Sequence, residues 1–92
     1  MIYGKLLGFQ KVHYKDKETK EDKVCCQAYF DVGEVSENDG VGHHTTTVTA
    51  WNEHCDWFFD KLFNEKLLGK KLLVDTFGFQ NSLAKSHIVK PD

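Results

Sequence analysis

The chain has 92 residues, of which 40% are hydrophobic and 28% are charged, and its formal net charge is −2. This length supports one domain over residues 1–92, and this composition excludes a disordered chain. No apolar run approaches the roughly 20 residues of a membrane-spanning helix. The opening residues have too short an apolar run and too many lysines for a secretory signal, so we expect a cytoplasmic protein without a membrane partner.

Charge is distributed unevenly along the chain. Residues 1–23 carry six lysines and four acidic residues, residues 24–65 one lysine and eight acidic residues, and residues 66–92 five lysines and two acidic residues. If the first and last strands lay side by side, one face would be basic despite the total; otherwise these are ordinary solvated lysines. Arginine is absent, which favours diffuse phosphate contacts over bidentate recognition of bases.

The first predicted element is a long strand over residues 2–14 that contains Gly4 and Gly8. Glycine inside a strand is typical of a bulge or bend, and a long bent first strand can pair in both halves of a small barrel. Two short strands broken at Gly8 are the alternative. Residues 15–23 contain no apolar side chain, which predicts a solvent-exposed loop or hairpin tip.

Residues 24–33 and 44–51 predict the second and third strands, separated by a turn-rich acidic segment. Alternation along the second strand points one set of residues at the core, namely Cys26, Ala28, Phe30 and Val32. It points the other set outward, namely Cys25, Gln27, Tyr29 and Asp31. On the third strand the inward set is Thr46, Val48 and Ala50. The outward set is Thr45, Thr47, Thr49 and Trp51, on the same side as Tyr29 if the two strands pair. Alternatively, Trp51 covers the core at one end of the barrel.

One helix follows the third strand. Its apolar stripe consists of Cys55, Phe58, Phe59, Leu62, Phe63 and Leu67, a spacing that predicts roughly four helical turns. Asn52 is the expected N-cap, and Gly69 is the expected left-handed residue that ends the helix. Trp57 lies off the stripe and is expected to be partly exposed. Residues 70–76 and 83–90 then predict the fourth and fifth strands.

The predicted class is therefore all-β with one helix. Five strands with the helix between strands 3 and 4 are the element order of the OB-fold, a Greek-key barrel in which this helix plugs one end. Many OB-folds bind oligonucleotides on the face of strands 2 and 3. That step from fold to function is an analogy.

The sequence offers little for catalysis or metal binding. His43 and His44 are adjacent and would point apart on a strand, and no paired ligands with a short spacer are present. Cys55 could pair with a histidine, but it lies on the stripe predicted to be buried, where thiols are inert. Three cysteines are an odd count that does not favour a disulfide framework. We expect no enzyme activity, no metal and no cofactor.

The run Ile2-x-Gly4-Lys5-Leu6-Leu7-Gly8-Phe9-Gln10, with the spacing to Gly69-Lys70-Lys71, resembles small single-stranded-DNA-binding proteins of the gene V type. Filamentous phages and phage-like or conjugative elements of bacteria encode these proteins. The resemblance covers the first strand and hairpin, and the rest only as a pattern. It implies an OB-fold, often a homodimer, that coats single strands cooperatively and without strong sequence preference. Replication proteins are the further partners that we expect. By position, it implies a set of basic and aromatic hairpin residues: Lys11, Tyr14, Lys15, Lys17, Lys20, Lys23 and Tyr29.

Two functions follow as hypotheses. The first is sequence-nonspecific binding of single-stranded nucleic acid, DNA rather than RNA, in replication or transfer of a phage or mobile element. Its predicted phosphate contacts are Lys11, Lys15, Lys17, Lys23 and Lys85, and its predicted stacking residues are Tyr14, Tyr29 and Trp51. The alternative is an OB-type protein-interaction or assembly module without nucleic-acid binding, which would use the acidic middle of the chain and an exposed strand edge.

Overall fold

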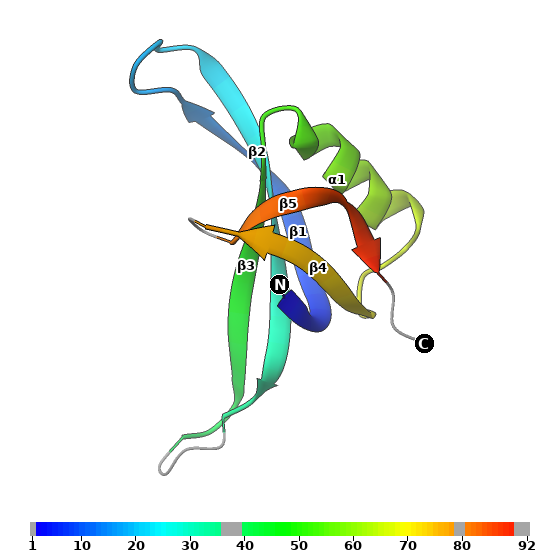
Figure 1. The fold of residues 1–92 in the computed structure, drawn as a ribbon. Coiled ribbons are helices and arrows are strands. Elements are labelled where there is room, and N and C mark those ends of the chain that lie inside the picture. The colour runs from blue at the N-terminus through cyan, green and yellow to red at the C-terminus, as the bar shows by residue number, and fades with distance from the viewer. Residues whose placement is uncertain (1, 36–39, 79–80, 90–92) are drawn as a thin grey trace.

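A computed structural model of the chain describes residues 2–35, 40–78 and 81–89, with side chains described as far as residue 83. Six elements follow one another: β1 (Ile2–Lys15), β2 (Asp22–Glu34), β3 (His43–Trp51), α1 (His54–Asn64), β4 (Lys71–Phe77) and β5 (Ser82–Val89). The strands close into a barrel in the order β1-β2-β3-β5-β4 (Figure 1). The predicted five-stranded OB-type barrel, with its helix between β3 and β4, is confirmed.

The barrel closes through pairings between segments distant in the sequence. β1, β2 and β3 form an antiparallel meander, β4 pairs antiparallel with β1, and β5 pairs parallel with β3. β4 thus separates β1 from β5, so the first and last strands do not form one basic face by lying side by side. Among the described residues, no helix is long and apolar enough to cross a membrane.

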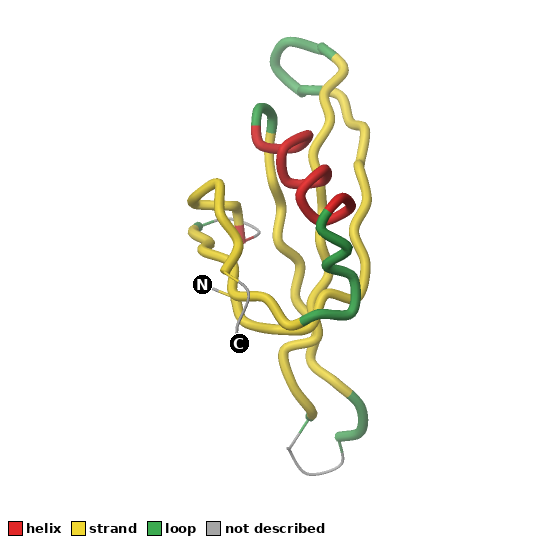
Figure 2. The backbone as a smooth tube through the Cα atoms, turned by 90° about the vertical axis from the view of Figure 1, so that its right-hand side faces the viewer, coloured by secondary structure: helices red, strands yellow, loops and turns green. Residues whose placement is uncertain are grey.

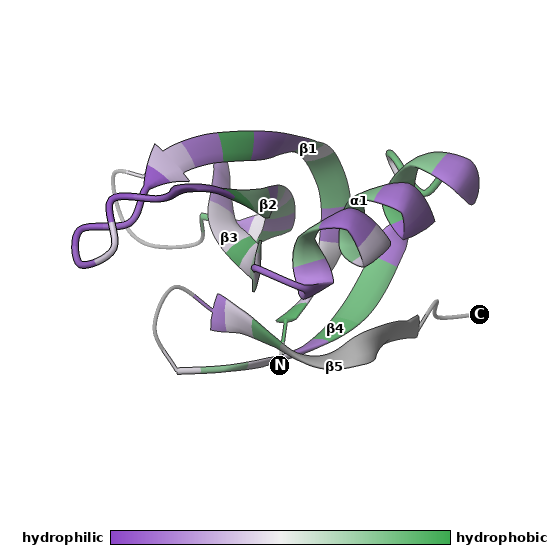
Figure 3. Cartoon of the chain, turned by 90° about the horizontal axis from the view of Figure 1, so that it is seen from above, coloured by the Kyte–Doolittle hydropathy of each residue, from purple (hydrophilic) through white to green (hydrophobic). Residues whose placement is uncertain are grey.

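β1 is a single long strand with an irregularity in the middle, as its two glycines predict. Its register with β2 shifts between Leu6 and Gly8, and its first residues pair with β4 instead. At Gly4 the neighbouring strand comes so close that a Cβ atom would lie 2.5 Å from the carbonyl oxygen of Asp31. The β1–β2 hairpin, hydrophilic at its tip, projects beyond the barrel (Figure 2, Figure 3).

Inward-facing residues of all five strands and of α1 form one apolar core. The largest fully buried side chains include Phe30, Leu6 and Leu72 from the strands and Phe58 and Leu62 from the helix. Three residues of the predicted stripe, Cys55, Phe58 and Leu62, therefore pack into the barrel from α1, and Trp57 and Phe59 lie half-buried against the cluster. Burying an aromatic or leucine side chain contributes about 1.5–3 kcal/mol, so this helix is a principal source of stability.

Both predicted helix boundaries are wrong. Asn52 has a φ of 51° and turns the chain after β3, while Glu53 occupies the N-cap without a side-chain hydrogen bond. The helix spans 11 residues, which is about three turns. Lys66, at a φ of 54°, is the left-handed residue that ends it. The amide of Leu67 donates to the carbonyl of Leu62 over 3.1 Å, which completes a Schellman motif. Gly69 is left-handed, with a φ of 83°, in the turn that follows.

Four side chains depart from the predicted faces. Cys25 is buried although it lies on the outer face, between Val12 and Trp51 on the adjacent strands, and Thr49 on the same face is fully buried. Val32 is 41% exposed because the register shift between Asp31 and Gly33 interrupts the alternation. Phe63 is 65% exposed because it lies in the last turn of α1, beyond the part of the helix that faces the core. Its ring contacts Phe59, which is itself only half-buried.

Candidate nucleic-acid interface

Three aromatic side chains share the outer surface of β1, β2 and β3. β2 pairs with both neighbours, so that Val12 lies opposite Cys25 and Cys25 opposite Trp51. Further along, Tyr29 lies opposite Gly8 on one side and Thr47 on the other. Since side chains alternate along a strand, the rings on the outer surface are those of Tyr14, Tyr29 and Trp51. We call this surface the aromatic face. The predicted pairing of the second and third strands, with Tyr29 and Trp51 on one side, is confirmed.

Tyr14 and Trp51 form an edge-to-face pair. Their ring centroids lie 5.8 Å apart and their planes are inclined by 88°. The indole Nε1 of Trp51 also donates a hydrogen bond to Ser82 Oγ on β5, with a distance of 3.1 Å. Trp51 is half-buried but stands outside the core cluster of the barrel. Two neighbours therefore fix its ring, and part of its surface remains open to solvent.

The Tyr29 ring is held by its hydroxyl group. Gln10 Nε2 donates to this hydroxyl over 2.6 Å, and the hydroxyl donates to Gln27 Oε1 over 3.1 Å. Gly8, opposite Tyr29, has no side chain, and a Cβ placed there would lie 3.9 Å from Tyr29 Cδ2. The ring is therefore held by two glutamines and lies over the backbone of Gly8.

A groove of about 560 Å³, which we call the aromatic groove, runs from the ring pair to the β1–β2 hairpin. Cys25 and Gln27 contribute to its lining, and the hairpin contributes four charged residues, namely Lys15, Asp16, Lys17 and Glu18. Among the described residues, no carboxylate forms an ion pair with Lys15 or Lys17. Both lysines are exposed, so their charges are available to an anion in the groove.

The Asp16 carboxylate is engaged in hydrogen bonds and an ion pair within the hairpin. Its Oδ1 accepts hydrogen bonds from the amides of Glu18 and Thr19, at 2.8 and 3.2 Å, and its Oδ2 lies 3.2 Å from Lys23 Nζ. These amide bonds, and then Lys23, hold the pKa of Asp16 below its ordinary value. The hydrogen bond to Asp16 in turn raises the pKa of Lys23. Lys23 is thus a structural partner of the loop, and its charge is largely offset.

A second hollow, of about 360 Å³, lies on the polar part of β2 and β3 and is lined by Gln27, Thr47, Thr49 and Asn81. Asn81 Nδ2 donates to Thr46 Oγ1 over 3.1 Å and to the carbonyl of Thr47 over 3.4 Å. Thr49 Oγ1 is buried and has no hydrogen-bond partner among the described residues. The hollow is therefore lined by amide and hydroxyl side chains.

The structure separates Lys11 from the other predicted site residues. Lys11 lies opposite Cys26, on the face of β1 that looks toward α1. Its Nζ lies 3.0 Å from Asp56 Oδ1 and 5.0 Å from the centre of the Phe59 ring. The hydrogen bond to Asp56 raises the pKa of Lys11. Lys11 therefore links β1 to the helix, away from the aromatic face. The side chain of Lys85 lies outside the described residues.

Gln10, Gln27 and Asn81 are functional candidates that sequence reasoning did not select. Alternation along β1 and β2 would have placed the two glutamines on the same face as Tyr14 and Tyr29. No local sequence pattern indicates a role for Asn81, because its position beside β3 depends on the parallel pairing of Thr49 with Ser82.

The thiols and histidines form no reactive cluster within the described part of the chain. No group of three or more His, Cys, Asp or Glu residues is placed to hold a metal ion there. Burial raises the pKa of Cys26 to about 12 and also raises the pKa of Cys25 and Cys55. All three cysteines are free thiols.

Comparison of the chain with protein-family models, curated proteins and solved structures yields no match.

Proposed function

We propose that the chain binds single-stranded nucleic acid on its aromatic face, without sequence preference. The observation that carries this proposal is that Tyr14, Trp51 and Tyr29 share one face of the sheet. On that face, Tyr14 and Trp51 line a groove together with Lys15 and Lys17, which have no ion pair among the described residues. Stacking of a base on an aromatic side chain contributes about 1–3 kcal/mol and tolerates any base, since every base has a π-face. The barrel supplies the rings from paired strands, which keeps their spacing fixed.

The phosphate contribution is expected to be modest. Lys15 and Lys17 line the aromatic groove, while Lys23 is tied to Asp16. Each neutralised phosphate of a single strand contributes about −0.7 to the slope of log affinity against log salt. With two available lysines, we expect a shallow slope of about −1.4, and affinity that rests mainly on stacking. Four further expectations rest on the resemblance of residues 2–10. They are a preference for DNA, a homodimer, replication proteins as partners, and a phage or mobile-element setting.

The decisive experiment is tryptophan fluorescence during titration with single-stranded oligothymidylate. The chain has two tryptophans, so the Trp57→Phe variant isolates the signal of Trp51. We expect quenching of Trp51 at about 50 mM salt, weaker quenching at about 200 mM, and little response to duplex. The Tyr29→Ala/Trp51→Ala variant, followed by gel shift, should bind at least about tenfold more weakly. An unchanged spectrum, together with no gel shift at the lower salt, would contradict the proposal.

A protein-interaction role without nucleic-acid binding is the second candidate. The net charge of −2 favours it, as do the exposed apolar side chains Leu7, Phe63 and Leu68. The two functions differ in the variants that abolish them. Loss of single-strand binding on removal of the Tyr29 and Trp51 side chains supports the first function. Loss of binding to a protein partner on removal of the Phe63 side chain supports the second.

A further inference from the structure

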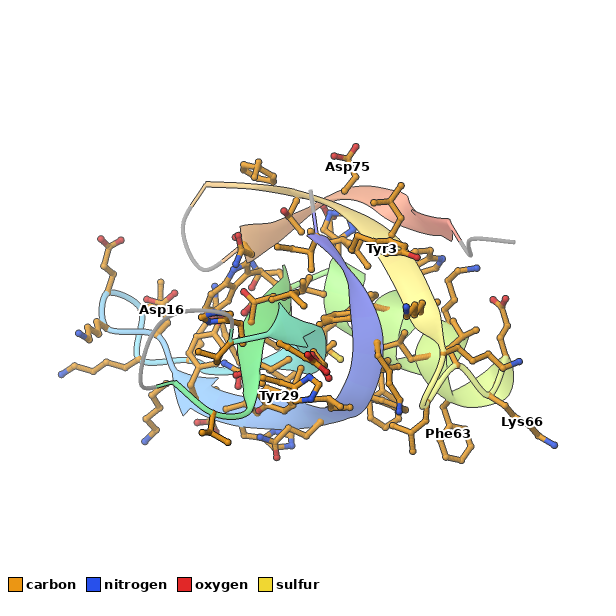
Figure 4. All side chains as sticks on the ribbon, turned by 90° about the horizontal axis from the view of Figure 1, so that it is seen from below. Tyr3, Asp16, Tyr29, Phe63, Lys66 and Asp75 are labelled. Atoms are coloured by element: carbon orange, nitrogen blue, oxygen red, sulfur yellow. The ribbon has the colours of Figure 1, made fainter. Side chains whose placement is uncertain are left out.

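A second groove, of about 590 Å³, lies on the other side of the sheet between β1 and α1. Leu7, Gly8 and Phe9 line it from the strand, and Phe59 and Phe63 line it from the helix. Lys66 and Leu68, just after the helix, complete it. We call it the helix-side groove. Figure 4 shows Phe63 and Lys66 projecting from the same corner of the molecule, remote from Asp16 on the hairpin.

The walls of the helix-side groove are unusually apolar for a free surface. Leu7 is 48% exposed, Phe63 65% and Leu68 59%. Behind them, the Phe59 ring stacks on Phe63 with centroids 6.2 Å apart and meets Phe9 edge to face at 5.1 Å. Contiguous apolar surface of this kind marks an interaction site more often than isolated exposed residues do.

The groove runs beside an open edge of β1. Within the described residues, β4 pairs with β1 only from Ile2 to Lys5. The last backbone hydrogen bonds on that edge join Leu6 to the turn before β4. The Leu6 amide donates to the Lys70 carbonyl over 2.9 Å, and the Gly69 amide donates to the Leu6 carbonyl over 2.8 Å. From Leu7 to Lys15 no described strand covers the edge. Backbone donors and acceptors next to an apolar groove fit an added strand, whose side chains alternate between the groove and solvent.

The charge of the groove lining indicates which kind of added strand would fit. Lys66 lines the groove, is exposed and has no ion pair among the described residues. In a symmetric dimer through this groove the same lining would meet itself, and that lining contains Lys66 but no carboxylate to neutralise it. A segment with carboxylates complements the edge instead.

We propose that the helix-side groove binds an extended segment of a partner protein, in which apolar side chains alternate with Asp or Glu, as an added strand on the edge of β1. This site goes beyond nucleic-acid binding and is independent of it. Because it lies on the opposite face of β1 from Tyr14, both ligands can bind at once. The chain would then connect a nucleic acid with an acidic partner segment.

The test is selection from a displayed library of random peptides of about eight residues, within the usual length of a strand. Wild-type protein should enrich peptides in which apolar and acidic residues alternate. Phe63→Ser should weaken binding of an enriched peptide by about tenfold. Phe77→Ser is the matched control, since Phe77 is 61% exposed at the end of β4, away from the groove. Lys66→Glu should shift the selection toward basic peptides.

Three outcomes would overturn the proposal. The first is a selection without consensus, and the second is equal binding to the Phe63→Ser and wild-type proteins. The third is a dimer, seen by sedimentation, that dissociates on Phe63→Ser, because a second copy would then be the occupant. Replacing one peptide residue with proline, which removes a backbone donor, should abolish strand addition. Circular dichroism of each variant checks that the fold is retained.

Discussion

The indole of Trp51 is held by a residue on each side: the edge of Tyr14, at a centroid distance of 5.8 Å, and Ser82 Oγ, at 3.1 Å from Nε1. The first contact links β3 to the β1–β2 hairpin, and the second links it to β5. Trp51 is thus placed by three parts of the barrel at once. A ring fixed in this way loses little conformational freedom on binding, which suits a stacking role.

Tyr29 allows the ring and its hydroxyl group to be tested separately. Tyr29→Phe keeps the stacking surface but removes the bonds with Gln10 and Gln27, so we expect single-strand affinity to fall less than threefold. Tyr29→Ala removes the ring and should weaken binding by about tenfold, the effect of about 1.4 kcal/mol. Fluorescence anisotropy with labelled oligothymidylate measures both. Equal losses would show that the hydroxyl, and not the ring, carries the contact.

Lys11 and Lys15 should differ in their effect on salt dependence. Lys15 lines the aromatic groove, so Lys15→Gln should make the log–log salt slope shallower by about 0.7. Lys11 is bound to Asp56 on the other face, so Lys11→Gln should leave the slope unchanged and lower the melting temperature slightly. Titrations at several salt concentrations and thermal melts separate the two effects. A shallower slope for Lys11→Gln would place this residue in the nucleic-acid path.

Gly4 and Gly8 provide a matched pair for stability. A Cβ at Gly4 would lie 2.5 Å from the Asp31 carbonyl oxygen, so Gly4→Ala must push β1 away from β2. We expect a loss of about 1–3 kcal/mol in the free energy of unfolding. At Gly8 the nearest atom is Tyr29 Cδ2 at 3.9 Å, and Gly8→Ala should be close to neutral. Urea denaturation measures both, and equal stabilities would contradict the close approach.

Asp16 should make the stability of the hairpin depend on pH. Its pKa is lowered from the ordinary value of 3.8, mainly by the amides of Glu18 and Thr19 and then by Lys23. The charged form is therefore the one that the fold favours. Its stabilisation is fully present above pH 3.8 and is lost as the pH falls through the lower, folded-state pKa.

The measurement is the melting temperature of wild type and Asp16→Asn as a function of pH. The wild type should melt higher near neutral pH, and the difference should shrink in acid, where both side chains are uncharged. Glu18→Gln is the control, since Glu18 lies in the same loop and its carboxylate has no ion pair among the described residues. A difference that stays constant down to pH 2 or so would show that the lowered pKa does not contribute.

The order of the strands and the helix along the chain could be predicted because their signals are local. β-branched residues from Thr45 to Thr49 and the helical stripe from Cys55 to Leu67 specify their elements without reference to the rest of the chain. The pairing of β2 with β3 agrees with the tendency of consecutive strands to pair. The barrel was predicted because this order of elements is that of the OB-fold. The shared face of Tyr29 and Trp51 followed from alternation along two strands, provided that the strands pair.

The predictions that were wrong depend on contacts distant in sequence or on local alternatives. Cys25 is buried on the outer face, where Val12 and Trp51 lie opposite it, and Val32 is exposed beside a register shift that alternation does not reveal. Asn52 suits both an N-cap and a left-handed turn, and it takes the second. The position of Lys11 beside Asp56 depends on how α1 packs against β1, which no pattern along a single strand can express.

The parallel pairing of β3 with β5 has a consequence for how the barrel forms during synthesis. β5 is made after every other element described, and its register partner Thr49 lies on the opposite side of the helix in sequence. Until β5 emerges, the β1–β2–β3 meander has an uncovered edge at β3. Closure over such a sequence separation is slow relative to hairpin formation. The nascent chain therefore passes through an open sheet, and Trp51 reports the moment of closure through its bond to Ser82.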